Sequence, residues 1–84
     1  MAYYDVFGTE IQEGDYILSS AKTGVTKVGY AYYSPRGNLL MKVVRQFVYG
    51  RDDRDHAPSS VAGVNVVVLK TKDGVIPGPV QNLW

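Results

Sequence analysis

The densest group of side chains that could do chemistry lies in the segment 50–60. Its possible ligands are Asp52, Asp53, Asp55 and His56. Carboxylates and imidazole can hold a divalent cation. A calcium loop needs a longer, spaced set of oxygens with a glycine at the turn and a distal Glu, which this segment lacks. Arg51 and Arg54 also raise the cost of holding a cation. We therefore expect a solvated, self-neutralised loop and no metal site.

His56 is the only histidine of the chain, and Ser59 and Ser60 follow it closely. A catalytic histidine needs a nucleophile or an orienting acid placed by a rigid scaffold, and nearness along a loop does not supply that geometry. The sequence also lacks a phosphate-cradling glycine loop, an HExxH motif and a Gly-x-Ser-x-Gly motif. We predict that the chain is not an enzyme, that it has no cofactor, and that it acts on no small-molecule substrate.

The charge is distributed unevenly along the chain, although its net value is only +1. Residues 1–15 carry four acids and no Lys or Arg, whereas residues 16–50 carry five basic residues and no acid. The basic segment also contains Tyr16, Tyr30, Tyr32, Tyr33 and Tyr49. Aromatic rings beside cations can stack nucleic-acid bases. Tyrosine is equally an anchor of protein interfaces and a good strand former.

A nucleic-acid interface is one hypothesis for this segment. If Lys27, Ala31 and Tyr33 face outward on one strand, and Lys42 and Arg45 do so on the next, they share one sheet face. The candidate contacts are Lys27, Tyr33, Lys42 and Arg45. Because nucleic-acid modules are usually more basic than this chain, we keep nucleic-acid binding as the alternative.

Protein binding is the leading hypothesis, either to another protein or to a second copy. Leu83 and Trp84 end the chain after Pro77-Gly78-Pro79, and they could fill the mouth of a barrel or insert into a partner. The predicted contacts combine exposed aromatic, aliphatic and arginine positions: Tyr33, Arg36, Arg45, Tyr49, Leu83 and Trp84.

Short β-strands separated by Gly and Pro must position these residues. The pattern predicts strands near 15–20, 25–33, 39–49 and 61–70, with a short closing strand at 75–76. It also predicts turns at 34–38 and 71–74, an exposed and mobile loop at 50–60, and a tail at 77–84. In the third strand we expect a bulge near 44–46, since a strict alternation would turn Arg45 inward. Val64, Val66 and Val68 are expected in the core.

The chain is predicted to be a single domain, residues 1–84, because its length leaves no room for a second core. About five antiparallel strands in so short a chain indicate an all-β small barrel. The absence of cysteine fits a reducing compartment. The start of the chain does not resemble a signal peptide, and no apolar run is long enough to cross a membrane. We therefore expect a cytoplasmic protein.

The segment Ile11-x-x-Gly14-Asp15-Tyr16-Ile17, followed by Gly24 and Gly29, resembles the entry of SH3-like barrels of the KOW type. With Asp5-x-Phe7-Gly8 in front, it looks like small SH3-like proteins of bacteriophages. The resemblance covers residues 5–30. It departs at Ala31, where the family usually has a large aliphatic residue. It implies an SH3-like barrel that binds nucleic acid or protein and rarely catalyses a reaction, and it would place a phage-encoded chain in the host cytoplasm.

Overall fold

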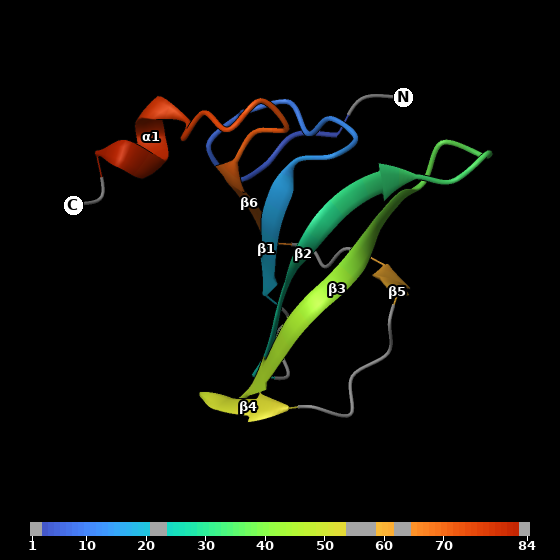
Figure 1. The fold of residues 1–84 in the computed structure, drawn as a ribbon, viewed down its shortest axis with the longest axis vertical. Helices are drawn as coiled ribbons and strands as arrows, with labels where there is room; N and C mark the ends of the chain where they lie inside the picture. The colour runs from blue at the N-terminus through green and yellow to red at the C-terminus, as the bar shows by residue number, and fades with distance from the viewer. Residues whose placement is uncertain (1–2, 21–23, 54–58, 62–64, 83–84) are drawn as a thin grey trace.

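The computed structural model describes residues 3–20, 24–53, 59–61 and 65–82, and it confirms the all-β prediction. Six strands form one sheet, and the only helix within the described residues is a single turn (Figure 1). The strands are β1 (Tyr16–Ser20), β2 (Val25–Tyr33), β3 (Leu39–Val48), β4 (Arg51–Asp53), β5 (Ser59–Val61) and β6 (Asn65–Lys70), and the helix is α1 (Gly78–Gln81).

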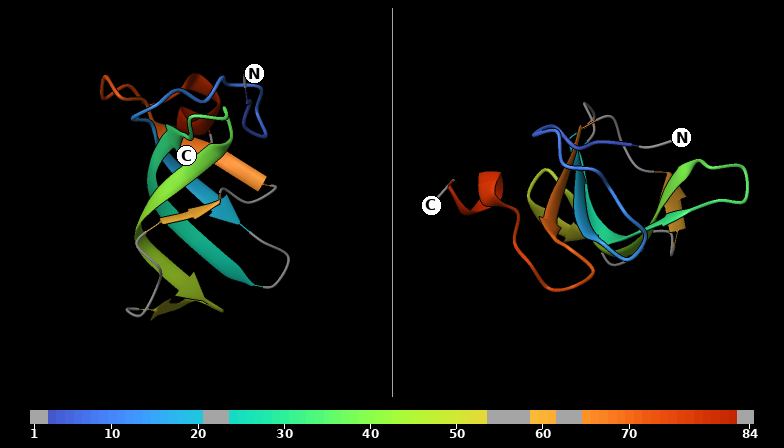
Figure 2. Two further views of the ribbon diagram at one scale, coloured as in Figure 1. Left: turned by 90° about the vertical axis from the view of Figure 1, so that its right-hand side faces the viewer. Right: turned by 90° about the horizontal axis from the view of Figure 1, so that it is seen from above.

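The sheet is rolled into a small barrel-like shape. Its strand order is β4-β3-β2-β1-β6, and β5 pairs with β3 outside this path. Only residues 62–64 separate β5 from β6 in the chain, yet β5 pairs with β3 and β6 pairs with β1. The two strands thus join opposite edges of the β1–β2–β3 meander, which curls the sheet around its core (Figure 2).

The core follows the period-two alternation of the strands. Ile17, Met41 and Val68 are fully buried, and Ile11 of the N-terminal segment covers one end of the cluster. Leu39, Ala31, Val43 and Val66 complete it. The predictions for Val66 and Val68 are confirmed, whereas Val64 lies outside the described residues.

Two buried aspartates fix the entry into the barrel. The Asp5 carboxylate accepts hydrogen bonds from the backbone N–H groups of Phe7, Thr9 and Val68, at 2.8–3.0 Å. The Asp15 carboxylate accepts N–H groups of Gln12 and Lys72, both at 2.9 Å. Each carboxylate therefore joins a local turn to a segment more than fifty residues away.

The predicted bulge in the third strand is confirmed. Val28 of β2 pairs with Arg45 and Gly29 pairs with Val43, so Val44 is the extra residue of β3. The bulge turns Arg45 to the side of the sheet away from the core, because it reverses the alternation that Leu39, Met41 and Val43 set up.

Both predicted tight turns are also present. In the turn 34–38, Gly37 donates to the Ser34 carbonyl at 2.8 Å and Asn38 donates to the Ser34 hydroxyl at 3.1 Å. In the turn 71–74, Gly74 donates to the Thr71 carbonyl at 2.8 Å.

The prediction of one loop over residues 50–60 is wrong, because β4 and β5 begin and end that segment. Val48 of β3 pairs with Arg51 of β4, and the two residues between them, Tyr49 and Gly50, form the turn. Their φ angles are 51° and 80°. Positive φ at both central positions is what a type I′ hairpin turn requires. Residues 54–58 lie outside the described part of the chain. The single strand predicted over 61–70 is divided between β5 and β6.

The closing strand predicted at 75–76 does not form: Val75 and Ile76 are exposed and lie outside the strands. The tail continues into α1, which has Pro79 in its first turn and buries Val80. Leu83 and Trp84 lie outside the described residues. Within the described part of the chain, no helix has the length and apolar character needed to span a bilayer.

Candidate functional site

The candidate site lies on the side of the sheet that points away from the core, which we call the outer face. On β1 and β2 the residues between the buried positions turn to this side. The outer face comprises Tyr16, Leu18, Val28, Tyr30, Lys42, Val44, Arg45, Val67 and Lys70.

Four residues form a continuous row across the outer face. Tyr16 pairs with Lys70 of β6 on one side and with Tyr30 of β2 on the other. Tyr30 in turn pairs with Lys42 of β3. Paired residues of neighbouring strands lie side by side on one face, so the row reads Lys-Tyr-Tyr-Lys across four strands.

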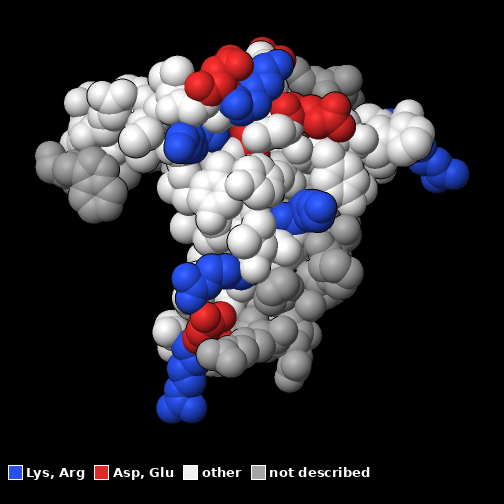
Figure 3. Space-filling view, in the orientation of Figure 1, with Lys and Arg blue, Asp and Glu red and all other residues white. Residues whose placement is uncertain are grey.

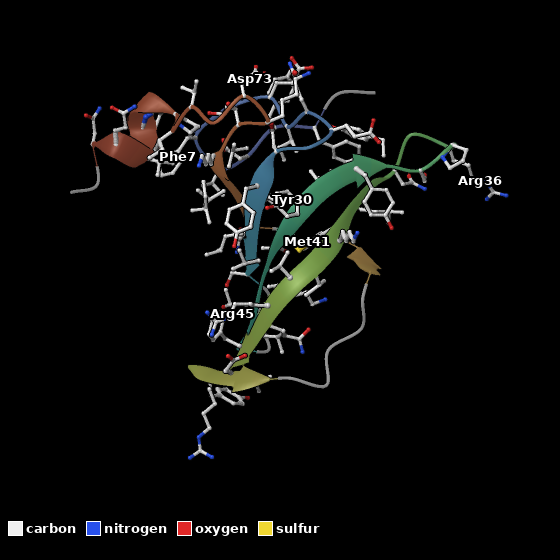
Figure 4. All side chains as sticks on the ribbon, in the orientation of Figure 1. Phe7, Tyr30, Arg36, Met41, Arg45 and Asp73 are labelled. Atoms are coloured by element: carbon white, nitrogen blue, oxygen red, sulfur yellow. The ribbon has the colours of Figure 1, made fainter. Side chains whose placement is uncertain are left out.

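The two tyrosines of the row contact each other. Their ring centroids are 5.2 Å apart, and the ring planes are inclined by 56°. Tyr30 nevertheless remains 48% exposed, in the middle of the outer face (Figure 4). Aromatic side chains usually bury most of their surface, so an exposed and supported ring is suited to stacking against a planar ligand.

The bulge of β3 places an aliphatic side chain beside this pair. A Cβ on Gly29 would lie 2.0 Å from the Lys42 carbonyl oxygen, which shows how closely β2 and β3 approach here. Val44, the extra residue between the partners of Val28 and Gly29, is 44% exposed. It lines one open groove together with Tyr16 and Tyr30.

Cations border this groove. Lys70 and Lys72 line it, with Asp73 as the one acidic residue among its lining residues. In Figure 3, which shows this side of the molecule, Lys and Arg flank an uncharged centre on several sides, and Asp and Glu lie among them at the upper margin and beside the lower basic group. The arrangement can hold a flat, partly apolar group in the centre and anionic groups at the margin.

Arg45 occupies the outer face below the groove and is held by two neighbours. Its guanidinium lies 2.6 Å from the Asp52 carboxylate and 5.1 Å from the centre of the Phe47 ring. Both side chains of the ion pair are about half exposed, at 56% and 41%, so the pair contributes at most about 1 kcal/mol to stability. It does orient Arg45 beside the outer face.

The predicted nucleic-acid residues divide between two faces. Lys42 and Arg45 share the outer face, as expected. Lys27 and Tyr33 belong with Gly29 and Ala31 to the other side of β2. The expectation that Ala31 faces outward is wrong, since Ala31 is 2% exposed in the core.

Tyr33 packs against the core and is half-buried. Its hydroxyl donates to the Ile11 carbonyl, and its ring lies 6.0 Å from that of Tyr3. Burial raises the pKa of Tyr33 above its ordinary value of 10.0, and the charges of Glu10 and Asp15 raise it further. Tyr33 thus closes the barrel beneath the N-terminal segment, and the outward orientation predicted for it is wrong.

The residues predicted to contact a protein are dispersed. Arg36 is exposed at the turn 34–38, far from Arg45 (Figure 4). Tyr49 is 81% exposed at the β3–β4 turn. Leu83 and Trp84 lie outside the described residues. The structure therefore does not gather the described members of this set into one surface.

The structure describes only part of the acidic segment that the sequence analysis considered as a metal or catalytic site. Asp52 is engaged with Arg45, the Asp53 backbone lies in β4, and Asp55 and His56 fall outside the described residues. Within the described part of the chain, no group of three or more Asp, Glu, His or Cys residues could hold a metal ion.

Sequence reasoning missed Tyr16, Tyr30, Val44 and Lys70. The sequence predicts the alternation of β2 correctly, but the prediction that the side with Ala31 is the outer one is wrong. The small residues Gly29 and Ala31 were the available signal, because a crowded barrel interior favours small side chains where two strands approach closely.

Comparison of the chain with models of protein families, with curated protein sequences and with solved structures finds no match.

Proposed function

We propose that this chain is a non-enzymatic binding module that holds single-stranded nucleic acid on its outer face. One observation carries the proposal: in the row Lys70–Tyr16–Tyr30–Lys42, two tyrosines lie between two lysines on neighbouring strands. Bases stack on aromatic side chains, and phosphates are neutralised by neighbouring Lys and Arg.

Unpaired bases fit this surface better than a duplex does. The rings lie on a sheet face beside an open groove, and a base must leave its partner to stack there. The net charge of the chain is only +1, so its attraction for polyanions is local. It comes from Lys42, Arg45, Lys70 and Lys72, against Asp52 and Asp73. We therefore expect moderate affinity and tolerance of base sequence. Since the chain has no cysteine, we place this activity in a reducing cytoplasm.

A protein partner is the second candidate, and a different part of the molecule favours it. Tyr49 and Arg51 are both exposed at the β3–β4 turn. Tyr and Arg are the side chains that most often dominate protein–protein affinity.

Fluorescence anisotropy with a labelled 12-nucleotide oligo(dT), its RNA counterpart and a duplex tests the nucleic-acid proposal. We expect saturable binding of the single strands, weaker binding of the duplex, and an affinity that falls with salt. For a single strand, the salt slope of log K decreases by about 0.7 for each phosphate that the protein no longer neutralises. Lys42→Gln and Lys70→Gln should each show that decrease.

Tyr30→Ala separates stacking from general attraction. Removing one stacking ring costs about 1–3 kcal/mol, which corresponds to a loss of affinity of roughly tenfold or more. Tyr4→Ala is the matched control, because Tyr4 is 61% exposed but belongs to the N-terminal segment. Absence of binding at about 20 mM salt, or equal binding by both variants, would refute the proposal.

A further inference from the structure

Tyr49 has a conformation that its own side chain disfavours. Its φ is 51°, and it is the only non-glycine residue with positive φ in the described part of the chain. Asn, Asp or Gly adopts the first position of a type I′ turn with less strain than Tyr does. A strained residue that persists at an exposed position points to a role outside folding.

The Tyr49 side chain also contributes little to the core. It is 81% exposed, the largest exposure among the large hydrophobic residues described. Its ring rests on Gly24, where an added Cβ would come within 2.5 Å of it. Gly24 therefore lies against one side of the ring, and the rest of the ring is open to a partner.

Tyr49 stands beside a cation. Val48, Tyr49, Arg51 and Asp52 line a small hollow at the β3–β4 turn, which we call the tip. Arg51 is exposed, and the Asp52 carboxylate is compensated by Arg45. The tip thus presents one aromatic ring and one guanidinium.

A groove of complementary charge lies at the other end of the molecule. It runs between the N-terminal segment and the turn after β6, and Glu10, Asp15, Lys72, Asp73 and Val75 are among its lining residues. Asp15 is buried and its carboxylate is engaged by backbone N–H groups, so Glu10 and Asp73 are the exposed acids beside Lys72. Val75 is 57% exposed and offers apolar contact. We call this the acidic groove. The tip and the acidic groove lie at opposite ends of the long axis (Figures 1 and 3).

We propose that the tip of one copy docks in the acidic groove of a second copy. The Tyr49 ring packs against the apolar side of the groove, and Arg51 pairs with Glu10 or Asp73. Because two different surfaces of one chain meet, the contact is heterologous, and it produces a row or a ring of copies rather than a closed pair. This association is a second activity beside nucleic-acid binding, and the two grooves have Lys72 and Asp73 in common.

Sedimentation velocity of nuclease-treated protein, over a concentration series from about 5 μM to 500 μM, tests the proposal in the range where weak contacts become visible. We expect the wild type to form dimers and larger species as its concentration rises. R51E and E10K should each remain monomeric, because each places like charges across the contact. Circular dichroism confirms that both variants are folded.

Mixing the two variants gives the decisive result. In a mixture, the acidic side chain that R51E introduces at the tip meets the basic side chain that E10K introduces in the groove. Opposite charges again face each other, so association should return although neither variant associates alone. Y49N should weaken association at least tenfold while keeping or raising the urea midpoint, because Asn tolerates positive φ. A wild type that stays monomeric, or a mixture that does not associate, would overturn the proposal. Neither result affects the nucleic-acid proposal, which is measured at low protein concentration.

Discussion

The Lys42 carbonyl oxygen lies 2.0 Å from the place where a Cβ on Gly29 would be. Ordinary contacts at that position begin above 3.4 Å, so even a methyl group forces β2 and β3 apart. The bulge at Val44 and the groove beside Tyr30 lie at this place, where β2 and β3 come close together.

Gly29→Ala should therefore destabilise the fold by about 1–3 kcal/mol, the usual cost of forced overpacking. The free energy of unfolding from urea denaturation measures this loss. Gly78→Ala is the matched control, because a Cβ there meets no atom within 4 Å. Equal urea midpoints for the two variants would show that β2 and β3 do not approach as closely as described.

Asp5→Asn should destabilise the protein by about 2 kcal/mol or more. The Asp5 carboxylate accepts three backbone N–H groups with its two oxygens, whereas an amide has only one oxygen and turns an NH₂ group toward donors. Glu13→Gln makes the same chemical change at an exposed position and should leave the free energy of unfolding within about 0.5 kcal/mol of the wild type. Similar losses in both variants would contradict the structural role of Asp5.

Tyr33 should make the stability of the protein fall at alkaline pH. Its pKa is raised in the folded chain, mainly by burial, so the unfolded chain releases this proton first as the pH rises past 10.0. The stability that protonated Tyr33 contributes to the fold is fully present below pH 10.0 and is lost as the pH rises above that value. Tyr33→Phe should consequently lose less stability than the wild type when urea unfolding is compared between about pH 9 and pH 11. Parallel pH profiles would mean that Tyr33 is not buried as described.

Asp52→Asn should strengthen oligonucleotide binding by about two- to fivefold, because it releases Arg45 from its ion pair and removes a negative charge near the outer face. The exposed ion pair stabilises the fold little, so the urea midpoint should hardly change. Anisotropy titrations at low salt measure the effect. Weaker binding by Asp52→Asn would show that Asp52 orients Arg45 productively instead of competing for it.

The strand framework and the bulge could be predicted because they follow from local pattern. The run Leu39, Met41, Val43 alternates clearly, and Arg45 at the next inward position required a break in register. The turns at 34–38 and 71–74 followed from Pro and Gly placement.

The site could not be predicted in the same way, because it depends on the register between strands and on which side of each strand is buried. Alternation gives two faces for a strand such as β2 but does not say which one is buried, and an aromatic residue such as Tyr30 or Tyr33 fits either side. The row that joins Lys70 to Tyr16 and Tyr30 requires the pairing of β6 with β1, which are far apart in sequence. β4 was missed because three residues are too short to show a pattern.

The most direct test of the central claim is an NMR titration of ¹⁵N-labelled protein with unlabelled single-stranded oligo(dT). We predict that the amide shifts of Tyr16, Tyr30, Val44 and Lys70 change together and saturate at one affinity, while those of Arg36 and Ala31 stay constant. Shifts confined to the side of β2 that carries Lys27 and Tyr33, or no shifts at all, would contradict binding on the outer face.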